Sequence, residues 1–352
     1  MPNLNRRHLL CALAAGAAPL IGRAAGAASP LRDVLDSAAQ PSALAARALV
    51  NGLALAGDRV VAVGQRGHVL WSDDQGKQWQ QADVPLASDL VAVTFPTSTR
   101  GWAVGHDGVV LASIDRGRTW QRQLDGRGLG DVLVRHYSRI GDAKWLAEAQ
   151  RFAAQGAENP LLDVWFDDAR TGYVVGAFGL VLRTADGGAT WEPLLHATDN
   201  PKALHLYAVR RVGDELYIAG EQGLLLRLDR SSGRFAALNI PYPGTLFGVL
   251  GHERVVLAFG LRGHVVRSTD RGRTWQAAST GVPVGLTAGT LDGRGRIVLV
   301  SQAGHVLASA DDGASFVPLK TARTLPAAAV AHAGAGTLVL GGPRGLLTVT
   351  GA

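Results

Sequence analysis

Ser113-Ile-Asp-Arg-Gly-Arg-Thr-Trp120 is the stretch that decides the fold, because variants of this eight-residue pattern recur along the chain. The other complete copies begin at Ser72, Thr184, Ser268 and Ser309. Successive copies start 41, 71, 84 and 41 residues apart, and the 84-residue interval contains a degenerate copy marked by Asp229, Gly233 and Phe235. A fixed period of this length indicates one supersecondary unit that is repeated many times.

A turn glycine inside an apolar hairpin stands about five residues before each copy. These glycines are Gly67, Gly108, Gly179, Gly223, Gly263, Gly304 and Gly345, which gives seven units. In the second unit, short apolar runs predict strands over 90–95, 101–105, 109–113 and 119–123. Four short strands in a unit of this length are typical of a propeller blade. The sequence therefore predicts an all-β, seven-bladed β-propeller with four-stranded blades, forming a single domain over 28–352.

The repeated box is expected to be structural. Its Asp can accept hydrogen bonds from backbone N–H groups of its own turn, its Gly can adopt a positive φ, and its aromatic residue can pack between neighbouring blades. The residues concerned are Asp74, Trp79, Asp115, Trp120, Asp186, Trp191, Asp270, Trp275, Asp311 and Phe316. A turn that recurs in every blade cannot be a single active site, so we expect neither catalysis nor metal binding from these carboxylates.

The last unit is one strand short. Strands are expected over 328–332, 337–341 and 346–350, after which the sequence stops at Ala352. A spare segment, Leu31–Gln40, precedes the first inner strand. We therefore expect this N-terminal segment to close the last blade as its fourth strand, which would remove an open sheet edge.

The first 27 residues have the pattern of a cleavable signal peptide. Arg6-Arg7 is followed by a modest apolar run over 9–21 and by small residues at 25–27. This pattern favours the twin-arginine export route over the general one and predicts a periplasmic protein. The run is too short and too rich in Ala for an integral membrane span. Cys11, the only cysteine, lies in this segment, so the mature chain is expected to lack thiols and disulfides.

The composition of the chain limits the kinds of partner that it can be expected to bind. The formal charge is +6, and removing Arg6, Arg7 and Arg23 with the signal peptide leaves +3. A net charge as small as +3, in a chain without a recognised nucleic-acid-binding motif, does not predict nucleic-acid binding. No cofactor motif or metal-ligand spacing is present, so we expect no cofactor and no metal, and a monomer.

One segment departs from the repeat. The 71-residue interval contains about 30 extra residues, 125–159, which begin with a glycine-rich stretch. A helix capped by Asp142 is expected after it, with an apolar stripe that includes Trp145 and Phe152. This stripe either packs on the propeller or forms a partner-docking element, and the sequence leaves both readings open.

The chain's strand alternation places this insertion at the same end of the propeller as the turns between second and third strands. Arg or His residues flank several of these turn glycines, and arginines suit carboxylate or phosphate groups on a partner. The candidate partner-binding residues are Arg66, Arg262, Arg344, His68, His264, His305, Arg135, His136, Tyr137 and Arg139. The alternative is that the arginines are solvated and the histidines bond to neighbouring loops.

The repeat resembles the Asp-box (BNR) repeat, which several families share. Box, period, unit number and the segments 62–72 and 103–113, with their Ala-Val-Gly and Val-Leu-x-Ser pattern, are most similar to the photosystem II assembly and stability factors over 48–352. The resemblance implies an exported, non-catalytic propeller that holds a newly made membrane-protein subunit through an arginine-rich face, here Arg66, Arg262 and Arg344. The insertion is similar to bacterial relatives whose hosts need not be photosynthetic.

The alternative function is that of a sialidase-like or other Asp-box glycoside hydrolase. Such enzymes need paired carboxylates, or a Tyr nucleophile backed by Glu and arginines. The chain has six Glu and no sialidase-type arginine segment, and most Asp residues belong to turns. Glu221 and Asp107 are the best-placed acids. We therefore expect a binding protein rather than an enzyme.

Overall fold

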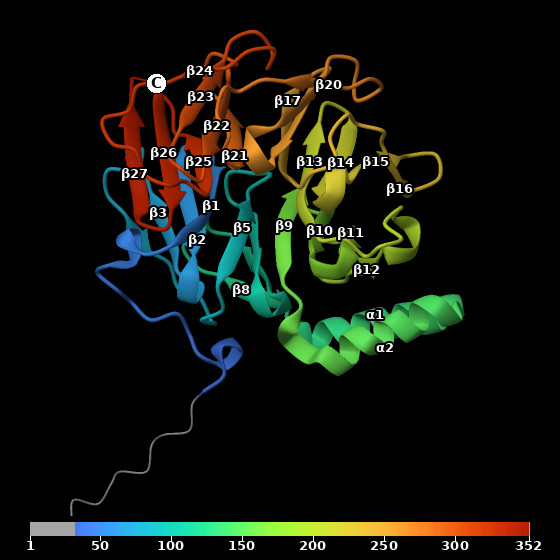
Figure 1. Cartoon of the computed structure of the whole chain (residues 1–352). Helices are drawn as coiled ribbons and strands as arrows, with labels where there is room; N and C mark the ends of the chain where they lie inside the picture. Colours follow the sequence, from blue (N-terminus) through green and yellow to red (C-terminus); the bar gives the residue numbers. More distant parts are fainter. Residues whose placement is uncertain (1–31, 352) are drawn as a thin grey trace, which may run out of the picture. The chain divides into compact units, whose positions relative to one another are not determined.

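A computed structural model describes residues 32–351, and residues 33–352 make up one compact unit (Figure 1). Every described helix and strand belongs to this unit. The predicted signal peptide, 1–27, and Cys11 lie outside the described residues. In the described part, no helix is both long enough and apolar enough to cross a membrane.

The unit consists of seven antiparallel sheets, each built from consecutive strands. Sheets 1 to 3 are β1 Val50–Ala56, β2 Arg59–Gly64, β3 Val69–Ser72, β4 Gln80–Gln81; β5 Leu90–Thr94, β6 Gly101–Gly105, β7 Val110–Ser113, β8 Gln121–Leu124; and β9 Leu161–Phe166, β10 Gly172–Gly176, β11 Val181–Thr184, β12 Glu192–Pro193. Sheets 4 and 5 are β13 Leu206–Val212, β14 Glu215–Gly220, β15 Leu225–Asp229, β16 Arg234–Ala237; and β17 Leu246–His252, β18 Val255–Gly260, β19 Val265–Ser268, β20 Gln276–Ala278. Sheets 6 and 7 are β21 Leu286–Leu291, β22 Ile297–Ser301, β23 Val306–Ser309, β24 Val317–Pro318; and β25 Ala329–His332, β26 Thr337–Gly342, β27 Gly345–Thr350.

Short 3-10 turns complete the secondary structure. Five of them join second to third strands, two precede β1, and two lie in the connections before β9 and β13. They are η1 Val34–Asp36, η2 Ala45–Arg47, η3 Gln65–Gly67, η4 His106–Gly108, η5 Gly156–Glu158, η6 Ala177–Gly179, η7 Leu195–Ala197, η8 Glu221–Gly223 and η9 Leu261–Gly263.

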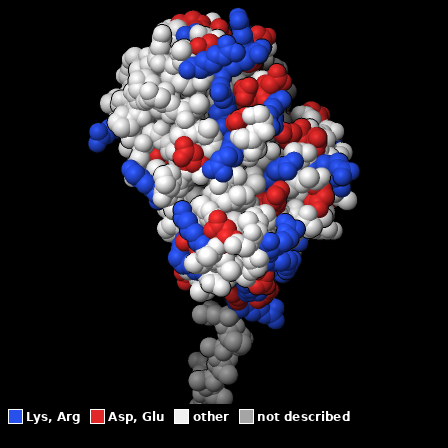
Figure 2. All heavy atoms as spheres, turned by 90° about the vertical axis from the view of Figure 1, so that its right-hand side faces the viewer, with Lys and Arg blue, Asp and Glu red and all other residues white. Residues whose placement is uncertain are grey.

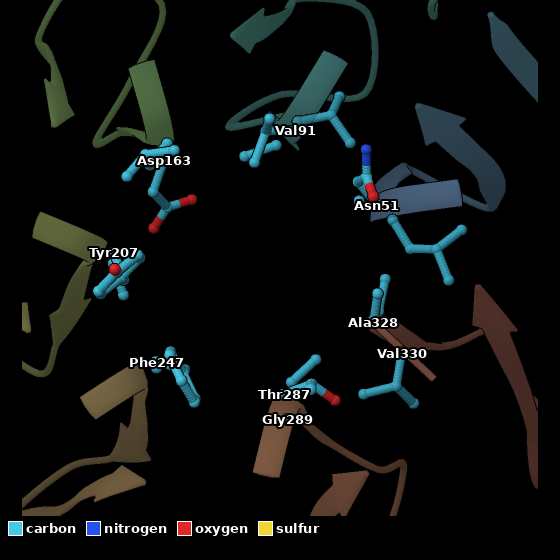
Figure 3. A pocket seen from close by; sticks show the side chains of 18 of the residues that line it. Asn51, Val91, Asp163, Tyr207, Phe247, Thr287, Gly289, Ala328 and Val330 are labelled. Atoms are coloured by element: carbon cyan, nitrogen blue, oxygen red, sulfur yellow. The ribbon is translucent and has the colours of Figure 1, made fainter. Parts of the chain in front are cut away.

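The sheets are arranged around one central cavity, which the first strand of every sheet lines (Figure 3). The second strands β2, β6 and β22 are buried at every residue. Burial on both faces explains why they appear in the sequence as continuous apolar runs, and burying this apolar surface stabilises the fold. The arrangement confirms the predicted all-β, propeller-like fold.

The box Ser113–Trp120 shows how the repeat holds its turn. Ser113 Oγ donates to Asp115 Oδ1 at 2.9 Å and accepts from the Gly117 amide at 2.9 Å. The same Asp115 oxygen accepts from the amides of Arg118 and Thr119, each at 3.0 Å. The Trp120 indole N–H donates to Gly117 O at 3.1 Å. These bonds satisfy polar groups that the tight turn would otherwise leave without partners.

The predicted closing strand is wrong. Sheet 7 has three strands, and no strand of residues 32–351 pairs with the free edge of β27. The N-terminal segment lies elsewhere: the Ala39 amide donates to Val84 O, and the Ala87 amide donates to Val34 O. Leu35, only 2% exposed, packs into the core shared by sheets 1 and 2, and this burial fixes the segment there.

Sheets 7 and 1 nevertheless contact each other through side chains. Gly341 of β26 leaves room for Val50, since a Cβ at Gly341 would lie 2.5 Å from Val50 Cγ1. Thr348 Oγ1 donates to Gly76 O at 3.1 Å. The first and last sheets are therefore joined without sharing a strand.

The insertion folds as a helical hairpin of α1, Gly126–Ile140, and α2, Ala143–Gln155, which extends sideways from the sheets (Figure 1). The helix after Asp142 was expected, whereas α1 was not, because its glycines suggest a loop. They serve close packing instead: a Cβ at Gly130 would lie 2.6 Å from Ala153 Cα. Asp125 caps α1 by accepting from the amides of Arg127 and Gly128.

Candidate partner-binding groove

The three turn arginines are exposed but belong to three different sheets. Arg66 lies between β2 and β3, Arg262 between β18 and β19, and Arg344 between β26 and β27. None of them forms an ion pair with another described residue. Because sheet 6 stands between Arg262 and the other two, the structure does not gather them into one contact.

The turn histidines have separate environments. His68 is 8% exposed, and burial lowers its pKa. His305 Nδ1 lies 2.9 Å from Ser301 Oγ, whereas the exposed His264 stacks on Tyr242 at 4.5 Å. Within residues 32–351, no group of three His, Cys, Asp or Glu side chains could hold a metal ion.

The central cavity has a volume of about 600 Å³, and the side chains of Asn51, Asp163, Tyr207 and Phe247 surround it (Figure 3). Asp163 is 3% exposed and accepts from the Val209 amide at 2.8 Å. Burial raises the pKa of Asp163, and an ion pair with Arg210 opposes that rise. The carboxylate is thus already engaged by protein groups, which disfavours a role as a free catalytic acid.

A second hollow, also of about 600 Å³, separates α1 from the outer edge of sheet 3. We call it the α1 groove. Arg135, His136 and Arg139 line it from the helix, and Arg183 and Trp191 line it from the sheet. Arg135 and Arg139 share one side of α1 because residues four apart are neighbours on a helix surface.

The α1 groove is locally basic. In the described structure, Arg135 and Arg139 have no ion-pair partner, and Arg183 approaches Glu192 only to 3.7 Å. Figure 2, which faces the side toward which the hairpin extends, shows basic and acidic groups interspersed rather than one continuous basic surface. Three guanidinium groups against one carboxylate therefore set this groove apart from its surroundings, and they favour an anionic ligand.

Two buried nitrogens of the groove residues have no hydrogen-bond partner among residues 32–351: Trp191 Nε1 and His136 Nε2. Trp191 is 8% exposed and His136 is 7% exposed. The indole N–H groups of three other box tryptophans, Trp79, Trp120 and Trp275, each donate to the carbonyl of the box glycine. A buried donor without an acceptor costs about 1–3 kcal/mol. Trp191 departs from its own repeat at the place where the arginines gather.

Tyr137 does not lie on the surface. It is 0% exposed, and burial raises its pKa to about 12. Its hydroxyl lies 3.3 Å from His196 Nδ1, in the connection after sheet 3. Tyr137 therefore attaches α1 to the propeller, and it cannot meet a partner in this conformation.

Of the predicted hairpin residues, the structure brings Arg135, His136 and Arg139 together. Sequence reasoning missed Arg183 and the special position of Trp191. The signal was available in part, because the 71-residue interval ends at the third box, which contains Trp191. Only the geometry of the helical hairpin shows that the insertion folds back over this box.

Fold and site together define a propeller-like Asp-box protein with an inserted helical hairpin. The model of one family, described as "Photosynthesis system II assembly factor YCF48", matches residues 71–150 and 148–319. The chain belongs to this family, which confirms the resemblance seen in the sequence.

Relatives support this membership. The photosystem II assembly lipoprotein Ycf48 of Synechococcus sp. (strain CC9902) is 29% identical over 192 residues, which cover 53% of this chain and 56% of that protein. The alignment thus spans little more than half of the relative's length.

Solved structures of similar fold include YCF48 bound to a D1 peptide, with a TM-score of 0.62 and 15% identity over 90% of this chain and 95% of that chain. YCF48 from Cyanidioschyzon merolae gives a TM-score of 0.62 and 15% identity, covering 88% and 97%. The WD40 propeller domain of Doa1 gives 0.63 and 11%, covering 90% and 95%. At such identities the likeness shows the fold alone.

Proposed function

We propose that this protein is an exported, non-catalytic assembly or stability factor that binds a segment of a membrane protein in its α1 groove. The observation that carries the proposal is the group of three guanidinium side chains, Arg135, Arg139 and Arg183, that line the groove with a single carboxylate, Glu192. The guanidinium groups would bind a partner carboxylate and neutralise its charge. Family membership supports a role in assembly.

The proposal includes a setting for the protein. It acts as a monomeric, seven-bladed propeller at the periplasmic face of the membrane, after export by the twin-arginine route. One structural relative, YCF48, has been solved with a D1 peptide bound, which supports a peptide segment as the kind of ligand. The client of this chain need not be a photosystem subunit.

A glycoside hydrolase remains the less favoured reading. Asp107 accepts from Ser88 Oγ at 2.6 Å, and Glu221 accepts from the His205 amide at 2.8 Å. These carboxylates, the best-placed acids in the sequence, are therefore each engaged by the connection that precedes their own sheet. Measurable hydrolysis of aryl glycosides by the purified protein would favour the enzyme reading.

Site-directed photocrosslinking in cells tests the binding proposal. A photoreactive residue at Val132, which lines the groove, should crosslink the exported protein to a membrane-protein segment. The double reversal Arg135→Glu with Arg139→Glu should abolish that adduct. The same charge change at Arg254 and Arg273, exposed arginines near the box turns of sheet 5, is the matched control and should preserve it.

The turn arginines provide the competing outcome. If Arg66→Glu, Arg262→Glu and Arg344→Glu together abolish the adduct while the groove reversal leaves it intact, the partner binds around the turns and the α1 groove proposal is wrong. Circular dichroism of each variant separates loss of binding from loss of fold.

A further inference from the structure

Three aromatic side chains join the hairpin to the propeller in what we call the His–Tyr–His joint: His136 and Tyr137 of α1, and His196 of η7. The rings of His136 and His196 lie 5.7 Å apart, and the Tyr137 ring lies 4.9 Å from His136 and 5.6 Å from His196. Trp145 of α2 stacks on Tyr137 at 6.1 Å. Both helices of the hairpin therefore depend on this contact.

The hydrogen bonds of the joint favour one protonation state of His196. The His196 backbone N–H donates to the Tyr137 hydroxyl oxygen at 3.4 Å, so the single hydroxyl hydrogen is free to donate. The hydroxyl lies 3.3 Å from His196 Nδ1 and can donate to that nitrogen when the nitrogen carries no proton. This arrangement requires a lone pair on Nδ1, and hence a neutral imidazole with its proton on Nε2.

A proton on Nδ1 breaks this arrangement. The imidazolium would then donate to the Tyr137 oxygen, and the hydroxyl hydrogen would have no acceptor among the described residues. Because Tyr137 is 0% exposed, water cannot replace that acceptor while the hairpin stays docked. The docked state therefore disfavours the charged form of His196.

The charges around the joint reinforce this preference. The groups that face it from the packed elements are Arg135, Arg139, Lys144, Arg183 and Arg234, against Asp142, Glu148, Glu192 and Asp199. Burial lowers the pKa of both His136 and His196, and nearby Arg139 and Arg234 respectively lower them further. The acidic groups nearby, Glu192 above all, oppose this without reversing it.

We propose that the His–Tyr–His joint is a proton-sensitive latch, in which protonation of His196 releases the helical hairpin from sheet 3. The released hairpin frees His196 to take up the proton in water, so acid favours the open form. The sign follows from linkage: docking is stable above the ordinary histidine value of 6.5 and weakens as the pH falls below it. The α1 groove would open with the latch, yet the latch can be measured with no partner present.

Hydrogen exchange of the purified protein at pH 7.5 and 5.5, corrected for intrinsic exchange rates, tests the latch. Amides of α1 and α2 should lose protection by up to about tenfold for each pH unit below 6.5, while those of β18 and β22 keep theirs. In His196→Asn, the amide oxygen can accept in place of Nδ1 and does not titrate, so the hairpin should lose the part of its pH response that comes from His196 and keep only that of His136. His264→Asn, an exposed histidine of sheet 5, should respond as the natural protein does.

Three outcomes would overturn the proposal: hairpin protection that does not change with pH, an equal loss across the sheets, or a pH response that is as large in His196→Asn as in the natural protein. If His196→Asn does not fold, Tyr137→Phe provides the test. Without the hydroxyl, the hairpin should be less protected at both pH values, and its pH response should be smaller, because burial of the histidines alone then opposes protonation.

Discussion

Gly130 of α1 touches the backbone of α2 at Ala153, where an added Cβ would come within 2.6 Å of Ala153 Cα. Gly128 lies two residues earlier in the same helix. A Cβ added there would meet only Leu124 Cδ1, at 3.6 Å, so this position has room for a side chain. Both glycines belong to α1, but only Gly130 packs directly against α2.

This difference gives the first prediction. Gly130→Ala should destabilise the hairpin by about 1–3 kcal/mol through steric overlap, whereas Gly128→Ala should stabilise it by about 0.5–1 kcal/mol through helix propensity. Hydrogen exchange of α1 amides measures both. If the two variants behaved alike, the close approach of the helices would be wrong.

The second prediction concerns the box tryptophans. Trp275→Phe removes a bond to Gly272 O, whereas Trp191→Phe removes an N–H that has no partner in the described structure. The first change should therefore cost about 1–3 kcal/mol more than the second in urea unfolding. Equal costs would mean that Trp191 Nε1 has an acceptor, such as a bound water.

A buried arginine gives the third prediction. Arg59 is 0% exposed, donates to both carboxylate oxygens of Asp73 at 2.7 Å, and lies 3.8 Å from the centre of the Trp71 ring. Asp73→Ala leaves this guanidinium buried and unpaired, so it should cost about 3–5 kcal/mol in thermal or urea unfolding. Asp58→Ala removes a carboxylate that pairs with Arg116 at the surface and should cost less than about 1 kcal/mol.

The fourth prediction is a pH dependence. Hydrogen bonds from their own turns, together with Ser and Thr hydroxyls, hold the pKa values of Asp74, Asp186 and Asp270 below the usual range. The same kind of bonds lowers that of Asp229 to about 2. A lowered folded-state pKa stabilises the fold above the unfolded value of about 3.9, and this contribution disappears as the pH falls through the folded value.

Urea midpoints should therefore fall steadily below about pH 4. Asp270→Asn should make the urea midpoint fall less steeply with decreasing pH, because this change removes one carboxyl group with a lowered pKa. A slope unchanged in Asp270→Asn would show that this box carboxylate does not contribute to acid sensitivity.

The sequence predicted the sheets well, since the box spacing and the apolar second strands are local signals. In sheet 2, the predicted runs 90–95 and 101–105 match β5 and β6 closely. The prediction from the sequence failed where the local conformational preference of the residues disagrees with their tertiary packing. The glycines of α1 favour a loop by propensity, and only their contact with α2 explains the helix.

The candidate site was predictable in part for the same reason. Arg135 and Arg139 could be chosen from the insertion, but their meeting with Arg183 depends on how the hairpin folds back. Leu35 likewise gave no sign that it would bury between sheets 1 and 2 instead of extending along β27.

The contact between Val50 and Gly341 has a consequence for chain connectivity. Neighbouring sheets elsewhere follow one another along the chain, whereas sheets 1 and 7 meet across nearly the whole sequence with no shared strand in the described residues. Loop-closure entropy opposes that contact more than any other, although it grows only slowly with length. Thermal opening should therefore begin at this seam.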